Sequence, residues 1–231
     1  MNISNNIKVI RSLIKQTENS ANRKPDSVLL LAVSKQQTSV AISEAFEQGI
    51  TDFGENYFQE AEKKIAQLKN LPIRWHFIGP VQSNKAKNIA PLFTWVHTID
   101  RIKVATLLSE SRPSDLPLLN VCLQINLTSE TTKSGISCDE AMELADAVSQ
   151  LPNIHLRGLM TIPPPLKDAQ QQYQLFLQLN QLMQLLNQQL NLNMDTLSMG
   201  MSDDLVPAIQ AGATIVRIGQ AIFGTRQGTS R

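Results

Sequence analysis

Short apolar runs alternate with longer segments of helical periodicity along almost the whole chain. The runs are rich in aliphatic and β-branched residues, and several are apolar throughout, as in strands that are buried on both faces. They predict eight strands, at residues 28–35, 50–54, 73–79, 95–99, 120–126, 156–161, 196–199 and 215–218. Helical patterns such as SVAISEAFEQG and CDEAMELADAVSQL lie between them. This alternation indicates βα units around a parallel sheet.

Two further segments have the periodicity of amphipathic helices. One covers residues 4–19 and precedes the first predicted strand. The other covers residues 170–193, is rich in Gln, and carries Leu175, Leu179, Leu182, Leu185 and Leu186 at helical spacing. We expect both to be outer helices of the fold.

Eight strands with a helix after each predict a (β/α)8 TIM barrel with an extra N-terminal helix. The length of 231 residues is close to the roughly 250 residues that are typical of this fold. A doubly wound open sheet gives a similar pattern and remains an alternative at this point. No linker or repeat divides the chain, so we expect one domain over residues 1–231.

Composition excludes several classes of protein. Hydrophobic residues make up 42% of the chain and charged residues 18%, which suits a packed core and excludes disorder. A net charge of +1 without a run of basic residues gives no electrostatic footprint for nucleic acid. The N-terminal segment resembles neither a signal peptide nor a membrane span, so we expect a cytoplasmic protein. Cys122 and Cys138 form no CxxC pair and predict no metal site.

Polar residues follow several of the predicted strands, at the barrel end where the chemistry of this fold is placed. The first run, VLLLAVSK, ends at Lys35. Partial burial there would supply the neutral amine that a Schiff base with an aldehyde requires, although an exposed lysine is the simpler interpretation. Glu55 and Asn56 follow the second strand. His76, in the third, is either a ligand contact or, more simply, a hydrogen-bonded core histidine.

The last two units indicate a phosphate site. In LSMGMSDD, Ser202 can cap the following helix, and in VRIGQAIFG the amides after Gly219 can begin a helix that faces an anion. Phosphate sites of these barrels are frequently built from the loops after strands seven and eight. Because the first and eighth strands are neighbours in a closed barrel, Lys35 and this site would lie together. The combination suits a phosphorylated aldehyde.

Eight sequence blocks then resemble one known family. LLAVSK, FGENYFQE, WHFIGPVQSNK, HTIDR, KSGI, RGLMTIP, LSMGMSDD and VRIGQAIFG occur in this order between residues 29 and 224. Together they resemble the YggS/PROSC family of pyridoxal 5′-phosphate (PLP) homeostasis proteins. One block would be weak evidence, whereas eight in register are specific.

The resemblance implies a monomeric barrel of the PLP fold type III that is shared with alanine racemase, without the C-terminal β-domain of the racemase. It implies PLP held as a Schiff base on Lys35. The family has no firmly established catalytic activity. Its members are thought to bind PLP reversibly and to buffer it or deliver it to apo-enzymes, with effects on vitamin B6 balance.

By position in these motifs, the cofactor contacts would be Lys35, Asn56, His76, Ser202, Arg217, Gly219 and Gln220. Arg217 would face the pyridine nitrogen and disfavour its protonation, although its place near a strand end suits a salt bridge equally well. Many relatives carry a small hydroxyl residue where this chain has Gln220, so we expect a backbone contact to phosphate there. Lys133 in KSGI is either a second, weak PLP contact or a solvated loop lysine, and the latter is simpler.

Two enzyme classes are the alternatives to a binding protein. A PLP-dependent amino-acid racemase needs an acid/base group on each face of its substrate, and in the resembling racemases a tyrosine from the dimer partner supplies the second. Tyr57 and Tyr173 occupy no obvious catalytic position, and the chain ends soon after its eighth unit. A phosphosugar isomerase or aldolase barrel shares the lysine and the phosphate site but not the eight blocks. We therefore expect a non-catalytic PLP carrier.

Overall fold

The structure is a computed structural model that describes residues 2–128 and 134–224. Its strands are β1 Leu29–Val33, β2 Asp52–Glu55, β3 Arg74–Phe77, β4 Trp95–Ile99, β5 Leu119–Gln124, β6 Ile154–Met160, β7 Thr196–Ser198 and β8 Ile215–Ile218. Its α-helices are α1 Ile3–Ser20, α2 Ser39–Glu47, α3 Phe58–Gln67, α4 Ala86–Leu92, α5 Ile102–Glu110, α6 Ala141–Ser149, α7 Ala169–Leu190, α8 Leu205–Gln210 and α9 Gln220–Phe223. A 3-10 turn, Ser83–Lys85, precedes α4.

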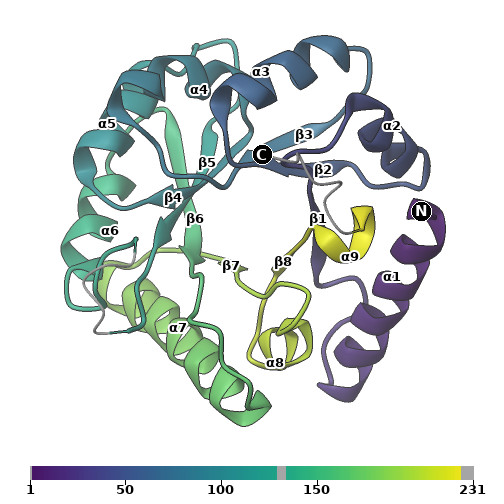
Figure 1. The fold of residues 1–231 in the computed structure, drawn as a ribbon. Helices are drawn as coiled ribbons and strands as arrows, with labels where there is room; N and C mark the ends of the chain where they lie inside the picture. Colours follow the sequence, from purple (N-terminus) through teal and green to yellow (C-terminus); the bar gives the residue numbers. More distant parts are fainter. Residues whose placement is uncertain (1, 129–133, 225–231) are drawn as a thin grey trace.

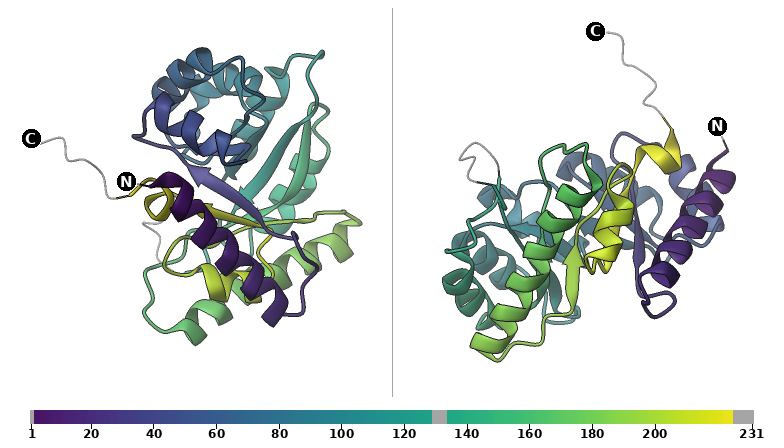
Figure 2. Two further views of the ribbon diagram at one scale, coloured as in Figure 1. Left: turned by 90° about the vertical axis from the view of Figure 1, so that its right-hand side faces the viewer. Right: turned by 90° about the horizontal axis from the view of Figure 1, so that it is seen from below.

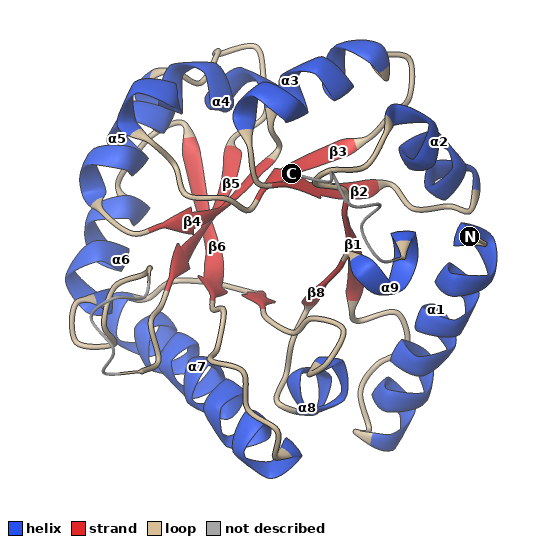
Figure 3. Cartoon of the chain, viewed as in Figure 1, coloured by secondary structure: helices blue, strands red, loops and turns tan. Residues whose placement is uncertain are grey.

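The strands join in sequence order into one closed barrel, and the helices surround it (Figure 3). Every pair of neighbouring strands is parallel, including β8 and β1, which close the barrel with Leu29 opposite Ile215 and Ala32 opposite Ile218. The predicted (β/α)8 barrel is confirmed, and the open sheet is excluded.

Strand positions follow the prediction closely, and the differences fall at strand ends. β1 ends at Val33, two residues before the predicted end, because Lys35 and Gln36 form a turn in which Gln36 has a φ of 62°. β6 begins at Ile154, two residues earlier than predicted, where Ile154 lies opposite Leu119 of β5.

Two apolar clusters divide the core. The larger one lies between the strands and the surrounding helices and includes Leu30 and Ala32 of β1. A small cluster around Leu31 fills part of the barrel interior, as expected from the alternation of side chains along a strand. The remaining interior is strongly polar, with four fully or almost fully buried side chains: His76, His97, Ser198 and Arg217.

The expected N-terminal helix is confirmed as α1, which lies outside the junction where β8 pairs with β1 and closes the barrel. It begins after Asn2, whose side chain accepts a hydrogen bond from the Asn5 amide, and its buried residues include Ile7 and Ile10. The helix packs beside α2, α8 and α9 (Figures 1 and 2). Asn6 Nδ2 donates to the carbonyl oxygen of Ile222 in α9 at 2.9 Å. The N-terminal helix thereby holds the short helix that follows β8.

Helix α7 corresponds to the Gln-rich segment and ends at Asn191, which has a left-handed φ of 51°. Leu179 and Leu186 are buried, together with Phe176. Leu185, expected on the same face, is 47% exposed, because it lies about 100° around the helix from Leu186. Within the described ranges, neither this helix nor any other is both long and apolar enough to cross a lipid bilayer.

Candidate functional site

Lys35 lies at the carboxyl end of the barrel, directly after β1. The inward-facing residues of this strand are Leu29, Leu31 and Val33, and the same alternation carries Lys35 toward the barrel mouth. The Ser34 amide still donates to the carbonyl of Gly54 in β2 at 3.0 Å, so the backbone beside the lysine remains tied to the sheet. Lys35 itself is half-buried.

Both neighbours of Lys35 belong to or contact a hydrogen-bonded cluster, which we call the clamp (Ser34, Glu55, Glu60 and Lys64); Ser34, Glu55 and Lys64 are buried and Glu60 is half-buried. Ser34 Oγ donates to Glu55 Oε1 at 2.6 Å. Lys64 Nζ donates to Ser34 O, Glu55 Oε1 and Glu60 Oε1 at 2.7, 2.8 and 2.6 Å. On the other side, the amide of Gln36 donates to Glu60 Oε1 at 2.5 Å. The clamp therefore fixes the turn that presents the lysine.

The clamp buries the carboxylate of Glu55 against the ammonium group of Lys64. Glu55 is fully buried, and burial raises its pKa although hydrogen bonds from Lys64 and Ser34 act in the opposite direction. Its Oε2 atom has no hydrogen-bond partner among the described residues. Lys64 was missed in the sequence analysis. The signal was its spacing of four residues from Glu60, which puts both side chains on one helix face.

A pocket of about 450 Å³ joins Lys35 to the start of α9. Gly219 and Gln220 line its other wall, and α9 begins at Gln220 with Gly219 at the N-cap. The hydrogen bonds of this turn use the amides of residues 222–224, and the amides of residues 220 and 221 point out of its first turn. A Cβ on Gly219 would lie 3.2 Å from the Val33 carbonyl oxygen, so glycine permits the close packing here.

Asn56 follows β2 at the same barrel end but lines a separate pocket of about 290 Å³, with Thr98 and Gln124 among its neighbours. Its Oδ1 atom is buried and has no hydrogen-bond partner among the described residues. A buried acceptor without a donor is costly. The amide side chain is therefore placed to receive a hydrogen bond from a ligand.

Arg217 lies below these pockets, in the barrel interior. Its Nη1 donates to Ser198 O and Ser198 Oγ at 2.6 and 3.1 Å, and its Nη2 donates to Thr161 O at 2.9 Å. Burial lowers the pKa of the guanidinium to about 10, with opposing help from Asp204, so it remains a cation at neutral pH. These bonds use three of the five N–H groups of an arginine. The strand-end salt bridge, the alternative interpretation of Arg217, is absent from the described residues, since every acceptor is neutral.

His76 also lies in the barrel interior. Both of its ring nitrogens are engaged: Nε2 lies 3.0 Å from Asp52 Oδ1, and Nδ1 lies 2.9 Å from His97 Nε2. Its ring stacks on Trp95 with 5.6 Å between centroids. His76 thus has the contacts of a hydrogen-bonded core histidine, the simpler of the two sequence-based interpretations. His97 was missed in the sequence analysis.

Ser202 lines neither of the two pockets. Ser202 is exposed in the turn after β7. The expected helix cap by Ser202 is wrong, because α8 begins at Leu205 with Asp204 at the N-cap. The side chain of Asp204 accepts from the Met201 amide and so closes the turn around Ser202. Lys133 lies outside the described residues.

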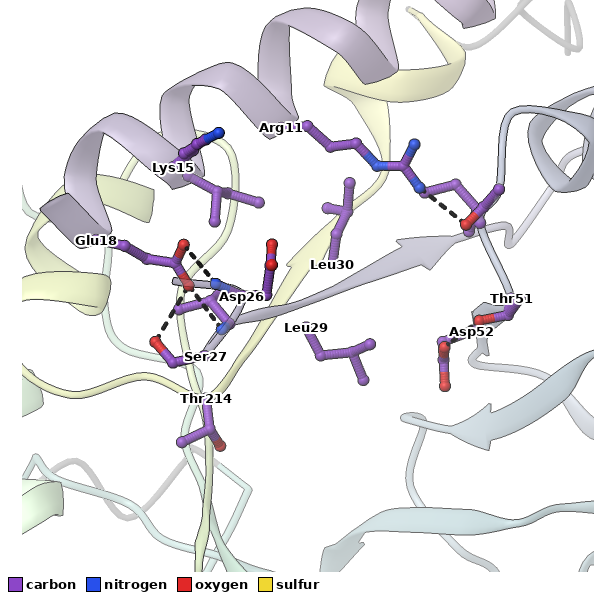
Figure 4. A pocket seen from close by; sticks show the side chains of 14 residues that line it. Arg11, Lys15, Glu18, Asp26, Ser27, Leu29, Leu30, Thr51, Asp52 and Thr214 are labelled. Atoms are coloured by element: carbon purple, nitrogen blue, oxygen red, sulfur yellow. Dashed lines mark hydrogen bonds between the residues drawn. The ribbon is translucent and has the colours of Figure 1, made fainter. Parts of the chain in front are cut away.

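Another pocket, of about 430 Å³, lies at the amino ends of the strands, beneath α1 (Figure 4). Two of its charged side chains, those of Glu18 and Arg11, are engaged in the fold. Glu18 accepts hydrogen bonds from Asp26 N, Ser27 Oγ and Val28 N, and Arg11 donates to two carbonyls of the α2 C-terminus. This pocket is remote from Lys35 and is not the candidate site.

The family of the alanine racemase N-terminal domain matches residues 2–227. The pyridoxal phosphate homeostasis protein of Pseudomonas aeruginosa is 52% identical over 224 residues, which are 97% of this chain and 96% of that protein. This chain belongs to the family of pyridoxal phosphate homeostasis proteins. Its Escherichia coli relative of the same name is 46% identical over 97% of each chain.

Solved structures support this family assignment. PipY of Synechococcus elongatus, solved with PLP bound, matches with a TM-score of 0.86 and 35% identity, over 96% of this chain and all 100% of that one. Alanine racemase of Corynebacterium glutamicum matches with a TM-score of 0.71 but only 16% identity, over 99% of this chain and 62% of the racemase. The racemase likeness therefore concerns the fold alone.

Proposed function

We propose that this homeostasis protein binds PLP as a Schiff base on Lys35 and holds it for release to other proteins. The observation that carries this proposal is the pocket that Lys35 shares with Gly219 and Gln220. An amine and the first turn of a helix thus face one space of about 450 Å³. The PLP-bound structure of PipY, a relative at 35% identity, supports PLP as the ligand.

Residues in and near this end of the barrel fit PLP. Asn56 Oδ1 is a buried acceptor that lacks a donor. Arg217 has N–H groups left after its hydrogen bonds to Ser198 and Thr161. Gly219 keeps the wall beside Val33 free of a side chain. Asn56 suits a polar substituent of the PLP ring, Arg217 suits the pyridine nitrogen, and the space beside Gly219 suits the phosphate.

Each residue then has a distinct role. PLP supplies an aldehyde, an anionic phosphate and a pyridine ring. Lys35 provides the amine once its Nζ has lost a proton. The amides of Gly219 and Gln220 bind the phosphate. Ser202, in the turn after β7, does not line the pocket in this structure and would have to turn toward it to add a hydroxyl contact. Arg217 keeps the pyridine nitrogen unprotonated, which makes the ring a weak electron sink and suits storage rather than turnover.

The racemase alternative finds no support in the placement of the tyrosines. Tyr57 is 56% exposed at the N-cap of α3, and Tyr173 packs from α7 against the outer core. Neither lines the pocket of Lys35. We propose a non-catalytic, cytoplasmic, monomeric carrier, built as one domain, that hands PLP to apo-enzymes and uses neither nucleic acid nor membrane. Racemisation of L-alanine or L-serine at about 1 per second or faster would contradict it.

The decisive experiment is an absorbance spectrum of protein incubated with PLP, before and after borohydride reduction, followed by peptide mapping. We expect a visible band, loss of this band on reduction, and a pyridoxyl group on Lys35. The Lys35→Ala variant should lack the band and keep its fold by circular dichroism. The matched control is Lys103→Ala, an exposed lysine on α5, which should keep the band. A pyridoxyl group on another lysine would refute the assignment.

A further inference from the structure

A buried chain of hydrogen bonds crosses the barrel interior. We call it the relay, and its members are Asp52, His76, His97, Ser198 and Arg217. Beyond the two contacts of His76 given above, His97 Nδ1 lies 2.8 Å from Ser198 Oγ, which accepts from Arg217 Nη1 at 3.1 Å. No member is more than 5% exposed. A cation thus stands at one end and a carboxylate at the other, with three neutral groups between them.

The two ends of the relay lie at opposite ends of the barrel. Asp52 is the first residue of β2 and lines the amino-end pocket (Figure 4), where it also accepts from Arg74 Nε and Nη2 at 2.7 and 2.5 Å. The Arg217 guanidinium instead reaches the carbonyls of Ser198 and Thr161, at the carboxyl ends of β7 and β6. The relay therefore links the amino end to the region of the candidate PLP site.

The chemistry of the members fixes the direction of every bond. Ionised Asp52 only accepts, so His76 donates to it from Nε2. A neutral His76 then accepts at Nδ1, and His97 must donate from Nε2. A neutral His97 in turn accepts at Nδ1 from the hydroxyl of Ser198, whose oxygen accepts from Arg217. Every donor hydrogen therefore points away from Arg217 and toward Asp52.

The surroundings support these protonation states. Burial lowers the pKa of His76, although Asp52 opposes it, and burial lowers the pKa of His97 further below its usual range. Burial alone would favour a neutral Asp52, but hydrogen bonds from His76 and Arg74 outweigh it and hold the pKa of Asp52 below its ordinary value. Both rings are therefore neutral, and the carboxylate is ionised, at neutral pH.

We propose that Asp52, His76, His97 and Ser198 are positioning residues that hold the Arg217 guanidinium, so that the charge of Asp52 at the amino end governs how tightly PLP is retained. This inference rests on the proposed function, which sets Arg217 against the pyridine nitrogen. The relay orients Ser198 Oγ as an acceptor, and this acceptor directs Nη1 of Arg217. The remaining N–H groups then have one fixed direction.

If the hydrogen bond between Asp52 and His76 reverses its direction, the later bonds of the relay must reverse as well, because a neutral imidazole has one donor and one acceptor. In Asp52→Asn, the amide can donate to His76, which allows every bond to reverse. Ser198 Oγ would then accept from both His97 and Arg217, and because it no longer donates its own hydrogen along the relay, it would be a weaker acceptor for Arg217. A substitution at one end of the barrel would thereby loosen the guanidinium near the other.

The first experiment needs no PLP. Nitrogen-15 NMR reports which ring nitrogen of a histidine carries the proton, and this chain has only three histidines. At pH 7.5, we expect neutral rings with the proton on Nε2 for both His76 and His97, and a proton on Nδ1 of His76 in Asp52→Asn. A charged ring, or a wild-type proton on Nδ1, would overturn the relay.

The second experiment measures PLP release into an excess of apo-enzyme and the position of the visible band. Ser198→Ala should release PLP about tenfold faster, the effect of one lost hydrogen bond to a charged group. Asp52→Asn weakens this bond without removing it, so it should release PLP faster than wild type by a smaller factor, and both variants should shift the band. Two matched controls should change neither. Ser109→Ala removes another buried hydroxyl, which accepts from Asn153 N. Asp195→Asn breaks another Asp–Arg pair, with Arg157.

A double variant separates positioning from packing. In an Arg217→Gln background, Ser198→Ala should change the release rate less than twofold, because the group that the relay positions is gone. An equal effect in both backgrounds would refute positioning through Arg217, and so would equal effects of Asp52→Asn and Asp195→Asn. If wild-type protein forms no PLP adduct at all, the proposed function fails, while the NMR result still decides the relay.

Discussion

Lys35 is oriented by the residues on either side of it. Ser34 is tied to Glu55 and Lys64, and the amide of Gln36 is tied to Glu60. The left-handed φ of 62° at Gln36 is uncommon for a residue with a side chain, and the clamp supplies the contacts that stabilise it. The position of the amine nitrogen therefore depends on a lysine one helix away, in α3.

Removal of Lys64 tests this dependence. Lys64→Met should lower the free energy of unfolding by about 3 kcal/mol, because it leaves Glu55 buried without a cation. It should also slow formation of the PLP adduct, since the turn at Gln36 loses its anchor. Urea denaturation and stopped-flow absorbance measure the two effects. Lys63→Met, at the neighbouring exposed position, should change neither, and an equal loss in both variants would contradict the role of the clamp.

At the scale of elements, the packing of the strands leaves different amounts of room for a side chain at two glycines, Gly158 and Gly54. A Cβ on Gly158 in β6 would lie 1.7 Å from the carbonyl oxygen of Thr196 in β7, so backbone must move. A Cβ on Gly54 in β2 would meet only side-chain atoms, of Ile78 at 3.0 Å and Leu31 at 3.4 Å. The pairing of β6 with β7 therefore requires glycine, whereas β2 can adapt.

Alanine substitutions measure this difference. Gly158→Ala should cost more than about 3 kcal/mol of unfolding free energy, and Gly54→Ala about 1 kcal/mol, since flexible side chains can yield. Thermal or urea unfolding of both variants provides the comparison. Equal losses would show that the contact between β6 and β7 does not set the limit.

The sequence pattern was enough for the order and type of elements but not for all of the site. Apolar runs predicted the eight strands because burial on both faces leaves a clear local signal. The turn after Val33 was not predicted, because the clamp that stabilises it includes two residues of α3, Glu60 and Lys64. Lys35 and Gly219 could be placed together once β1 and β8 were taken as neighbours. The link from His76 to His97 and Ser198 could not, since it joins side chains up to 101 residues apart.

At the scale of the whole molecule, the buried histidines link stability to pH. Unfolded histidines take up a proton near pH 6.5, whereas burial lowers the pKa of both His76 and His97 in the folded state. The unfolded state therefore binds more protons below about pH 6.5, and stability falls with acid by up to about 1.4 kcal/mol per pH unit for each histidine.

A histidine variant isolates this contribution. In His97→Gln, the slope of unfolding free energy against pH between 5 and 6.5 should decrease by about 1.4 kcal/mol per unit relative to wild type. The difference between the two proteins cancels the opposite effect of Glu55, whose raised pKa favours the folded state in acid. Above pH 7.5 the two curves should run parallel. Identical slopes at low pH would mean that His97 is charged in the folded state.

The hydrogen bond from Asn6 to Ile222 spans 216 residues and bears on when the protein can first act. During synthesis, β1 and its lysine leave the ribosome long before β8 and α9 have been made. Until then, the growing chain has the amine without the opposite wall of the pocket, and α1 has no α9 to hold. Under the proposed function, PLP capture therefore requires a chain that has been synthesised through α9.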